Sequence, residues 1–449
     1  MREDPGRVLV AGGGTAGIAA ALTLVRGGWK VVLLEASSRL GGRTYSFRAS
    51  GLGGVEVDNG PHMLVGAYRE FRALLGELGT EGAFLHAPAL DLSFLGPGGR
   101  IYRLKARASL PSPFSLLAGL LTYKVLSFRE RIRTALALGR LLGRKEPAGG
   151  TVGAWLDREG LQGGPARYLL APLCRAVLNT REGVASLASF AAALRETFHG
   201  PPSNSALWVP ERPWSRILGG PALERLRSLG VDVRLETRLE GVEFREGRFF
   251  AARTSRGKFQ GKGLLLCLPP WRIRGLLPGG ILPPGWEDLR PSSMEIFYVR
   301  GGPALEAVEK VPGGVLGLPP GGAFDFLVSC PGGVAAFLAT PAGEGAGKDG
   351  KGVRGEGIPP GLGIPGGGRG EGRTLRLVWE KAVLHQPLGV ESLRPGVVVG
   401  DGGLFLGGDW IDTGLPATLE SAARSGRAAG GAFLERFGKE MKETGERRR

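Results

Sequence analysis

The fold of this chain is decided by the stretch Val8-Leu9-Val10-Ala11-Gly12-Gly13-Gly14-Thr15-Ala16-Gly17-Ile18-Ala19-Ala20-Ala21-Leu22. It predicts a short apolar strand over 8–11, a glycine turn and the start of a helix, and the apolar run 30–34 predicts a second strand. Gly12 permits the tight turn, Gly14 lets a pyrophosphate approach the backbone, and Gly17 permits close packing of the helix on the strand.

Glu35 ends the second expected strand, where a carboxylate would accept the hydroxyls of an adenosine ribose. The order of strand, turn, helix, strand and acid predicts a βαβ dinucleotide-binding unit. Its phosphates would face the helix N-terminus, at Thr15 and Ala16. A glycine turn without a ligand is the alternative, and the surrounding pattern disfavours it.

The composition is that of a large globular protein with a basic charge. The 449 residues include 79 glycines and 32 prolines, but 42% are hydrophobic and these fall in periodic runs, which excludes global disorder. Three cysteines and four histidines lie far apart in the sequence, so neither a disulfide framework nor a metal site is expected.

The segment 100–148 holds eleven Lys or Arg and two Glu, interleaved with leucines. Such a basic amphipathic segment favours an anionic membrane surface over nucleic acid. The alternative is an ordinary amphipathic helix on the protein's own core, with a solvated basic side. Neither a signal peptide nor an 18-residue apolar run is found, so a cytoplasmic protein held peripherally at a membrane is expected.

The rest of the chain divides by pattern. Segment 81–214 is mostly helical in pattern, and 230–239 and 263–268 are expected strands. Segment 341–373, with fourteen glycines in 33 residues, predicts a mobile insertion. Strand 404–410 precedes a helix expected from residue 415, and 437–449 is expected to be a charged tail.

Two further motifs, Arg39-Leu40-Gly41-Gly42-Arg43 and Asp58-Asn59-Gly60-Pro61-His62, follow the first. With it they resemble the flavoprotein superfamily of amine oxidases and carotenoid desaturases. The resemblance implies FAD, an α/β fold with a discontinuous Rossmann-like FAD-binding domain, and an inserted substrate domain of mixed sheet and helices. The cofactor-binding residues that it implies, with those of the first motif, are Gly12, Gly14, Thr15, Ala16, Gly17, Glu35, Arg39, Gly42, Arg43, Gly60, Pro61, His62, Leu239, Gly408, Asp409, Leu415, Pro416 and Ala417.

The implied FAD-binding domain comprises 1–80, 215–272 and 400–436, and the implied substrate and membrane-facing domain comprises 81–214 and 273–399. Segments 58–68, 173–180 with 185–186, and 408–418 narrow the resemblance to the hydroxysqualene dehydroxylases, from residue 6 to about 435, apart from the glycine-rich insertion. That family reduces hydroxysqualene to squalene on the route to hopanoids, with the flavin reduced beforehand. The chain departs from it at Pro61, where the family usually has glutamine, so a role of that amide in substrate binding does not carry over.

His62 is the candidate catalytic acid for loss of the allylic hydroxyl, and a histidine that only hydrogen-bonds loop backbone is the alternative. Arg175 and Asn179 stand on an expected helix, where a structural hydrogen bond is the favoured role. Trp155, Trp208 and Trp214 could line a polyene tunnel, but tryptophans of this kind more often belong to the core.

Three other functions stay open. A carotenoid or phytoene-type desaturase shares fold, cofactor and lipid substrate. An amine oxidase is disfavoured because related amine oxidases use a lysine on the corresponding strand to hold a water near the flavin, and residues 291–299 contain no lysine. A flavin-free prenyl-lipid carrier is disfavoured because the glycine motif is intact. The expected partners are a long-chain isoprenoid substrate, an anionic membrane, enzymes of the squalene pathway and an electron donor that the sequence does not identify.

Overall fold

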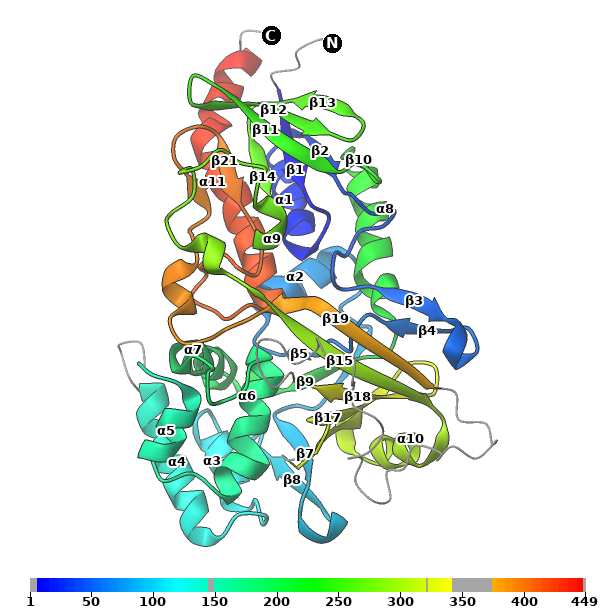
Figure 1. Ribbon diagram of the computed structural model, residues 1–449, viewed down its shortest axis with the longest axis vertical. Helices are drawn as coiled ribbons and strands as arrows, with labels where there is room; N and C mark the ends of the chain where they lie inside the picture. Colours follow the sequence, from blue (N-terminus) through cyan, green and yellow to red (C-terminus); the bar gives the residue numbers. More distant parts are fainter. Residues whose placement is uncertain (1–5, 144–148, 320–321, 341–373, 447–449) are drawn as a thin grey trace.

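The computed structural model describes residues 6–143, 149–319, 322–340 and 374–446, with side chains to residue 438 (Figure 1). The glycine-rich insertion expected at 341–373 lies outside these residues. The described part of the chain forms two large sheets, three smaller sheets and a group of helices.

The first large sheet joins three distant parts of the sequence. Its six strands have the order β10-β2-β1-β14-β21-β20, and they are parallel except for β20 against β21. Helices α1, α2, α8 and α11 accompany it, and α1 lies alongside α11 (Figure 1). The bounds are β1 (Arg7–Ala11), β2 (Lys30–Leu34), β10 (Asp232–Arg234), β14 (Leu264–Leu266), β20 (Val398–Val399), β21 (Leu404–Leu406), α1 (Thr15–Arg26), α2 (Arg69–Glu77), α8 (Gly220–Ser228) and α11 (Leu419–Glu446).

Glycines make this sheet possible at the point that the sequence marks. Gly12 has φ +106°, and a Cβ there would lie 2.4 Å from the carbonyl oxygen of Cys267. A Cβ at Gly17 would lie 1.8 Å from the carbonyl oxygen of Gly12. Helix α1 can therefore approach the end of β1 only without side chains at these positions.

The second large sheet has seven strands in the order β19-β15-β18-β17-β16-β7-β8, and its neighbours are antiparallel except for β16 beside β7. Helix α10 packs on it. The bounds are β7 (Asp91–Leu95), β8 (Ile101–Lys105), β15 (Pro291–Arg300), β16 (Val315–Gly317), β17 (Phe326–Cys330), β18 (Val334–Ala339), β19 (Thr374–Leu384) and α10 (Gly302–Glu309).

Five helices gather at the end of the molecule opposite the chain termini, around a core of their own (Figure 1). They are α3 (Phe114–Leu121), α4 (Phe128–Gly143), α5 (Val152–Arg158), α6 (Ala171–Leu178) and α7 (Leu187–Phe198). The remaining strands and α-helix are β3 (Ser46–Ala49), β4 (Val55–Asp58), β5 (Leu64–Val65), β6 (Phe84–His86), β9 (Leu207–Pro210), β11 (Leu239–Arg245), β12 (Arg248–Thr254), β13 (Gly257–Gln260) and α9 (Pro270–Ile273).

This architecture confirms the predicted fold class, an α/β protein with a discontinuous Rossmann-like sheet and an inserted mixed sheet with helices. The residue boundaries of the two domains stay a prediction. No helix in the described part of the chain has both the length and the apolarity to cross a membrane.

Some element predictions were wrong. The strand expected over 230–239 is broken into β10 and β11, because Glu236 turns with φ +50° and its N–H donates to Ser37 O. The mostly helical segment 81–214 also contributes β6, β7, β8 and β9. Helix α11 runs on to Glu446, into the segment for which the sequence predicts only a charged tail.

Candidate functional site

A cavity of about 620 Å³ lies at the carboxyl ends of β1, β2, β14 and β21, where open α/β sheets bind their ligands. Many of the predicted site residues line it: Gly12, Gly14, Thr15, Ala16, Glu35, Arg39, Gly42, Arg43, His62, Leu239, Gly408, Asp409 and Ala417. The other predicted residues, Gly17, Gly60, Pro61, Leu415 and Pro416, lie outside this lining. The cofactor-binding role of each residue stays a prediction.

The N-terminus of α1 forms the part of the cavity that suits an anion. Gly14 is its N-cap and no side chain caps the helix there, so the first-turn N–H groups are available to a ligand. Gly42 faces Gly14 closely, since a Cβ at Gly42 would lie 3.0 Å from Gly14 Cα. Two bare backbones and the nearby Arg43 therefore form a cradle that fits a pyrophosphate.

Glu35 holds the glycine turn at the adjacent corner. Its Oε2 accepts from Gly13 N at 2.7 Å, and its Oε1 accepts from Ser37 N and Ser37 Oγ, both at 2.8 Å. A carboxylate has about four acceptor positions, so acceptor capacity is left for a ribose hydroxyl. The residue thus orders the turn and fits the predicted ribose contact.

An ion pair links the two sequence-distant halves of the lining. Arg43 donates to Asp409 Oδ1 at 2.7 Å and to Ala382 O at 3.2 Å. Arg43 and Asp409 are 366 positions apart in the chain. The pair fixes the Arg39–Arg43 loop against the turn that follows β21.

A buried arginine, Arg394, holds the turn after β21 through hydrogen bonds to its backbone. Arg394 donates to the carbonyl oxygens of Asp409 and Ile411, both at 2.7 Å, and also to that of Leu415. Its own charge is disfavoured there, since burial lowers the pKa of Arg394. The loop from Asp409 to Leu415 is therefore preorganised by side chain to backbone bonds rather than by regular structure.

The helix expected from residue 415 begins later, so that prediction was wrong. Ala417 N donates to Gln386 Oε1 at 2.9 Å, which holds residues 415–417 in a loop. Thr418 then caps α11, because its Oγ1 accepts from Ser421 N at 3.2 Å. The positive end of the helix thus meets the cavity at Thr418 and Leu419, two lining residues that the sequence analysis missed.

His62 lies in the cavity wall as a neutral ring. Its Nδ1 is 2.7 Å from Gly60 O, and since a carbonyl only accepts, Nδ1 carries the proton and Nε2 is unprotonated. Burial lowers the pKa of His62 from 6.5 to about 4. The bond is the loop contact named above as the alternative to catalysis, and the acid role stays a prediction.

Asp58, which the sequence analysis quoted without a role, supports this wall. Its Oδ1 accepts from Ser46 Oγ at 2.6 Å and from Trp214 N at 2.9 Å, and Trp214 Nε1 donates to His62 O at 3.1 Å. Burial raises the pKa of Asp58 from 3.8 to about 6. Its place at the end of a short strand, Val55–Asp58, was the signal that could have found it.

Other lining residues were also missed. Arg272 follows β14 in the short helix α9, and its place after a parallel strand could have indicated it. Ala382 and Val383 come from β19, whose pairing with β15 brings a distant strand to the cavity. Nothing local in the sequence marks that pairing.

Arg175 and Asn179 both bind other parts of the protein. Arg175 is paired with Asp325 and with Glu182, each at 2.7 Å. Asn179 ends α6 with φ +45°, rather than standing inside a helix as expected, and its Nδ2 donates to Ser293 O at 3.2 Å. Trp155, Trp208 and Trp214, for which the sequence favoured a core role over a tunnel lining, are all buried in hydrophobic clusters.

The comparisons with known proteins agree with this geometry. The model of the family described as flavin containing amine oxidoreductase matches residues 15–290. The hydroxysqualene dehydroxylase of Zymomonas mobilis is 28% identical over 94% of this chain and 97% of its own length. That of Rhodopseudomonas palustris is 27% identical over 95% of this chain and 98% of its own length.

Two further similarities are looser. The 15-cis-phytoene desaturase of an Oncidium hybrid cultivar is 27% identical over 55% of this chain and 43% of its own length. The solved structure of cyclohexylamine oxidase from Brevibacterium oxydans superposes with a TM-score of 0.65 at 18% identity, over 96% of this chain and 98% of that one. At that identity the superposition supports the fold alone.

Proposed function

The chain belongs to the flavin containing amine oxidoreductase family, and we propose that within this family it reduces hydroxysqualene to squalene. It is an FAD-dependent oxidoreductase. A place in hopanoid biosynthesis belongs to the same proposal.

One observation carries the proposal. The similarity to hydroxysqualene dehydroxylases extends over 94% of this chain, whereas that to the Oncidium phytoene desaturase covers 55%. A shared nucleotide-binding fold does not by itself specify the substrate, because function resides in the site and not in the fold. Likeness over nearly the whole chain therefore favours the dehydroxylase reaction.

The reaction needs a hydride and a proton. The allylic C–O bond breaks, the hydroxyl leaves as water with one added proton, and a hydride forms the new C–H bond at the allylic carbon. Reduced FAD supplies the hydride. The protein has to hold the cofactor, exclude water and control the proton.

His62 is the residue that we propose for proton control. With Nδ1 bonded to Gly60 O, Nε2 is the nitrogen left to meet a substrate hydroxyl. Since burial lowers the pKa of His62 to about 4, protonation of the ring limits an acid step at neutral pH. We expect the rate to rise as the pH falls from 7 toward 5, provided that the fold persists.

Replacement tests this role directly. We expect His62→Ala to keep bound flavin and to lose turnover by about 10²–10⁴-fold, the contribution of a positioned general acid. Turnover equal to that of the wild type would remove His62 from the mechanism.

The substrate assay separates the candidate functions. Dithionite-reduced protein is incubated with hydroxysqualene, oxidised protein is incubated with phytoene, and the products are read by mass spectrometry. Squalene in the first reaction supports the proposal, and dehydrogenated phytoene in the second with no squalene supports a desaturase instead.

The two other functions have less support. β15 (Pro291–Arg300) contains no lysine, which the related amine oxidases use to hold a water at the flavin. A prenyl-lipid carrier would purify without the visible flavin band, so a colourless protein that resists loading with FAD would favour it.

A further inference from the structure

Helix α4 carries two apolar faces, and only one of them packs on the core. Ala137, Leu138 and Leu141 are buried against the other helices of this end. Phe128, Ile132 and Leu136 are 68%, 38% and 57% exposed. Because each helical residue turns by about 100°, these three form one stripe, well away from the buried face. An ordinary amphipathic helix accounts for the buried face and leaves this stripe unexplained.

Helix α3 adds a second exposed apolar stripe. Phe114, Leu117 and Leu121 are 58%, 36% and 38% exposed, and their spacing of three and four residues places them on one face. Together the two helices expose six large apolar side chains within 23 residues of sequence. Clustered exposure of this kind marks a binding surface, whereas single exposed residues do not.

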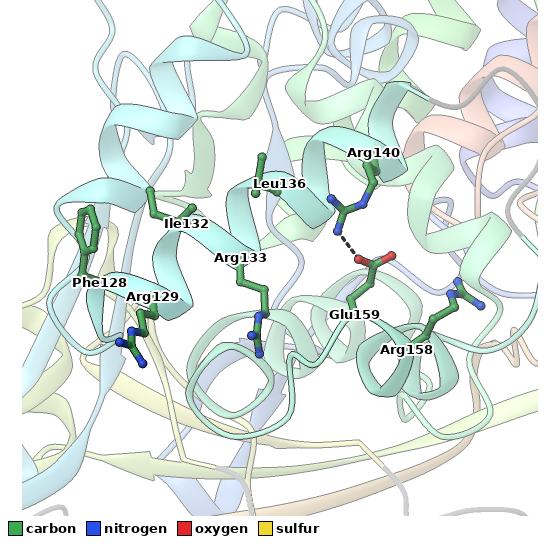
Figure 2. A pocket seen from close by; sticks show the side chains of 8 residues that line it. All are labelled: Phe128, Arg129, Ile132, Arg133, Leu136, Arg140, Arg158 and Glu159. Atoms are coloured by element: carbon green, nitrogen blue, oxygen red, sulfur yellow. Dashed lines mark hydrogen bonds and ion pairs between the residues drawn. The ribbon is translucent and has the colours of Figure 1, made fainter.

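Arginines lie directly beside the α4 stripe. Figure 2 shows Arg129 and Arg133 leaving α4 next to the apolar side chains, toward an open groove of about 610 Å³ between α4 and α5. Arg140 in this groove is paired with Glu159, and Arg133 donates to Gly160 O at 3.1 Å. Arg129 has no hydrogen-bond or ion-pair partner among the described residues, so its charge is available to a ligand.

The positive charge around α3 and α4 indicates which kind of partner this surface binds. Residues 101–143 contain eight Lys or Arg and a single acidic residue, Glu130. A second copy of this chain on the same face would bring like charges together, which is unfavourable. An anionic lipid surface matches both features, because arginines reach headgroup phosphates while neighbouring apolar side chains enter the acyl boundary.

We propose that the exposed face of α3 and α4 docks this protein onto an anionic lipid bilayer. The six apolar side chains insert at the interface, and Arg129, Arg133 and Lys124 contact the headgroups. Helices α3 and α4 lie at the end of the molecule opposite the chain termini (Figure 1), so docking through them would leave the six-stranded sheet at the far end from the membrane. The surface argument is independent of the reaction, and only the idea that the substrate enters from the bilayer rests on the proposed function.

The test is co-sedimentation of the full-length flavoprotein with vesicles of equal parts phosphatidylcholine and phosphatidylserine at low salt. The variant replaces the α4 stripe together, Phe128→Ser, Ile132→Ser and Leu136→Ser. Its matched control replaces three apolar residues of comparable exposure elsewhere: Leu85→Ser, Leu388→Ser and Val398→Ser, at 61%, 55% and 49% exposed.

We expect the stripe variant to bind vesicles on the order of 100-fold more weakly than the wild type, since burial of each large apolar side chain contributes about 1.5–3 kcal/mol when complete. The control should bind like the wild type. Arg129→Gln should weaken binding several-fold at low salt and make little difference at high salt.

Three outcomes would overturn the proposal: wild-type protein that stays in the supernatant, a stripe variant that binds as well as the wild type, or a wild-type dimer that becomes monomeric in the stripe variant. The last would make the face an interface between two copies. Flavin content and melting temperature confirm that each variant is folded. The assay uses no isoprenoid substrate, so it can succeed or fail whether or not hydroxysqualene is reduced.

Discussion

Replacing Gly14 or Gly17, the two glycines at the start of α1, by alanine should have different effects on the protein. Gly17→Ala should lower its stability, and Gly14→Ala should lower its affinity for FAD. A Cβ at Gly17 would lie 1.8 Å from Gly12 O and 3.0 Å from Gly12 C, while the nearest atom to a Cβ at Gly14 is Gly42 Cα at 3.8 Å. Gly17→Ala therefore meets rigid backbone, and Gly14→Ala meets ordinary contact. The first substitution tests packing and the second tests the cofactor cradle.

The size of each effect follows from these distances. Gly17→Ala needs helix α1 to retreat by about 1.5 Å before its new methyl reaches normal contact, so we expect a loss of at least about 3 kcal/mol in stability. Gly14→Ala loses a favourable N-cap residue and should cost below about 1 kcal/mol. Its methyl occupies the anion cradle, so FAD affinity should fall at least about tenfold.

Thermal unfolding measures the loss of stability, and FAD titration measures the loss of cofactor affinity. We expect Gly17→Ala to melt well below the wild type even with excess FAD, and Gly14→Ala to melt close to the flavin-free wild type. Wild-type stability in Gly17→Ala would refute the argument that α1 is fixed on the turn. Wild-type FAD affinity in Gly14→Ala would refute the location of the pyrophosphate.

Three further predictions concern side chains of the site. Glu35→Ala leaves Gly13 N and Ser37 N without acceptors, so it should cost about 1–3 kcal/mol in stability and lower FAD affinity, as melting and titration would show. Arg394→Leu removes the side-chain donor from four loop carbonyls and should lower the melting temperature and flavin content together, with partial recovery in Arg394→Lys. Because the folded-state pKa of His62 is about 4 against 6.5 when unfolded, the unfolded state takes up the proton first as the pH falls, and stability present above about pH 6.5 is lost toward pH 4 by up to about 3 kcal/mol. Melting at pH 7.5 and pH 5 should therefore separate the wild type from His62→Asn, and an equal drop in both proteins would contradict the lowered pKa.

The nucleotide-binding half could be predicted because its signals are local. The turn at Gly12 and the contact at Gly17 each depend on a missing side chain, and such positions can be read from a single sequence. Glu35 followed from its place at the end of a strand. These residues and their order predict the βαβ unit, whereas the discontinuous domain and its inserted mixed sheet were implied by the resemblance that the motifs 39–43 and 58–62 carry.

The errors arose where tertiary contacts override local pattern. Alternation over 230–239 predicts one strand, but hydrogen bonds to Glu35 O and Ser37 O bend the chain between β10 and β11. The sequence around Pro416 predicts a helix start, but Gln386 holds Ala417 N in the loop and Thr418 supplies the cap. Gln386 is 31 positions from Ala417, so periodicity could not have indicated it, whereas Thr418 is a local capping residue that the sequence could have shown.

The basic helical segment shows a different limit of prediction from the sequence. The leucines of 100–148 were consistent both with a core-facing helix and with a membrane-facing one, since hydrophobicity does not say which residues are covered. Accessibility separates them: Leu138 and Leu141 are buried, whereas Phe128 and Leu136 are exposed. Only the folded chain could assign the two faces of α4.

Burial of two ionisable groups gives the wall around His62 its chemical character. Burial disfavours charge, so it raises the pKa of Asp58 to about 6 and lowers that of His62 to about 4, four residues apart on one segment. At neutral pH the ring is uncharged and the Asp58 carboxylate is turned to Ser46 Oγ and Trp214 N. An uncharged ring costs little to cover with hydrocarbon, whereas an imidazolium would have to be stripped of water first. The same burial that suits this wall to the isoprenoid substrate that we propose therefore makes the proton scarce, and we expect a proton-limited rate that rises with acidity.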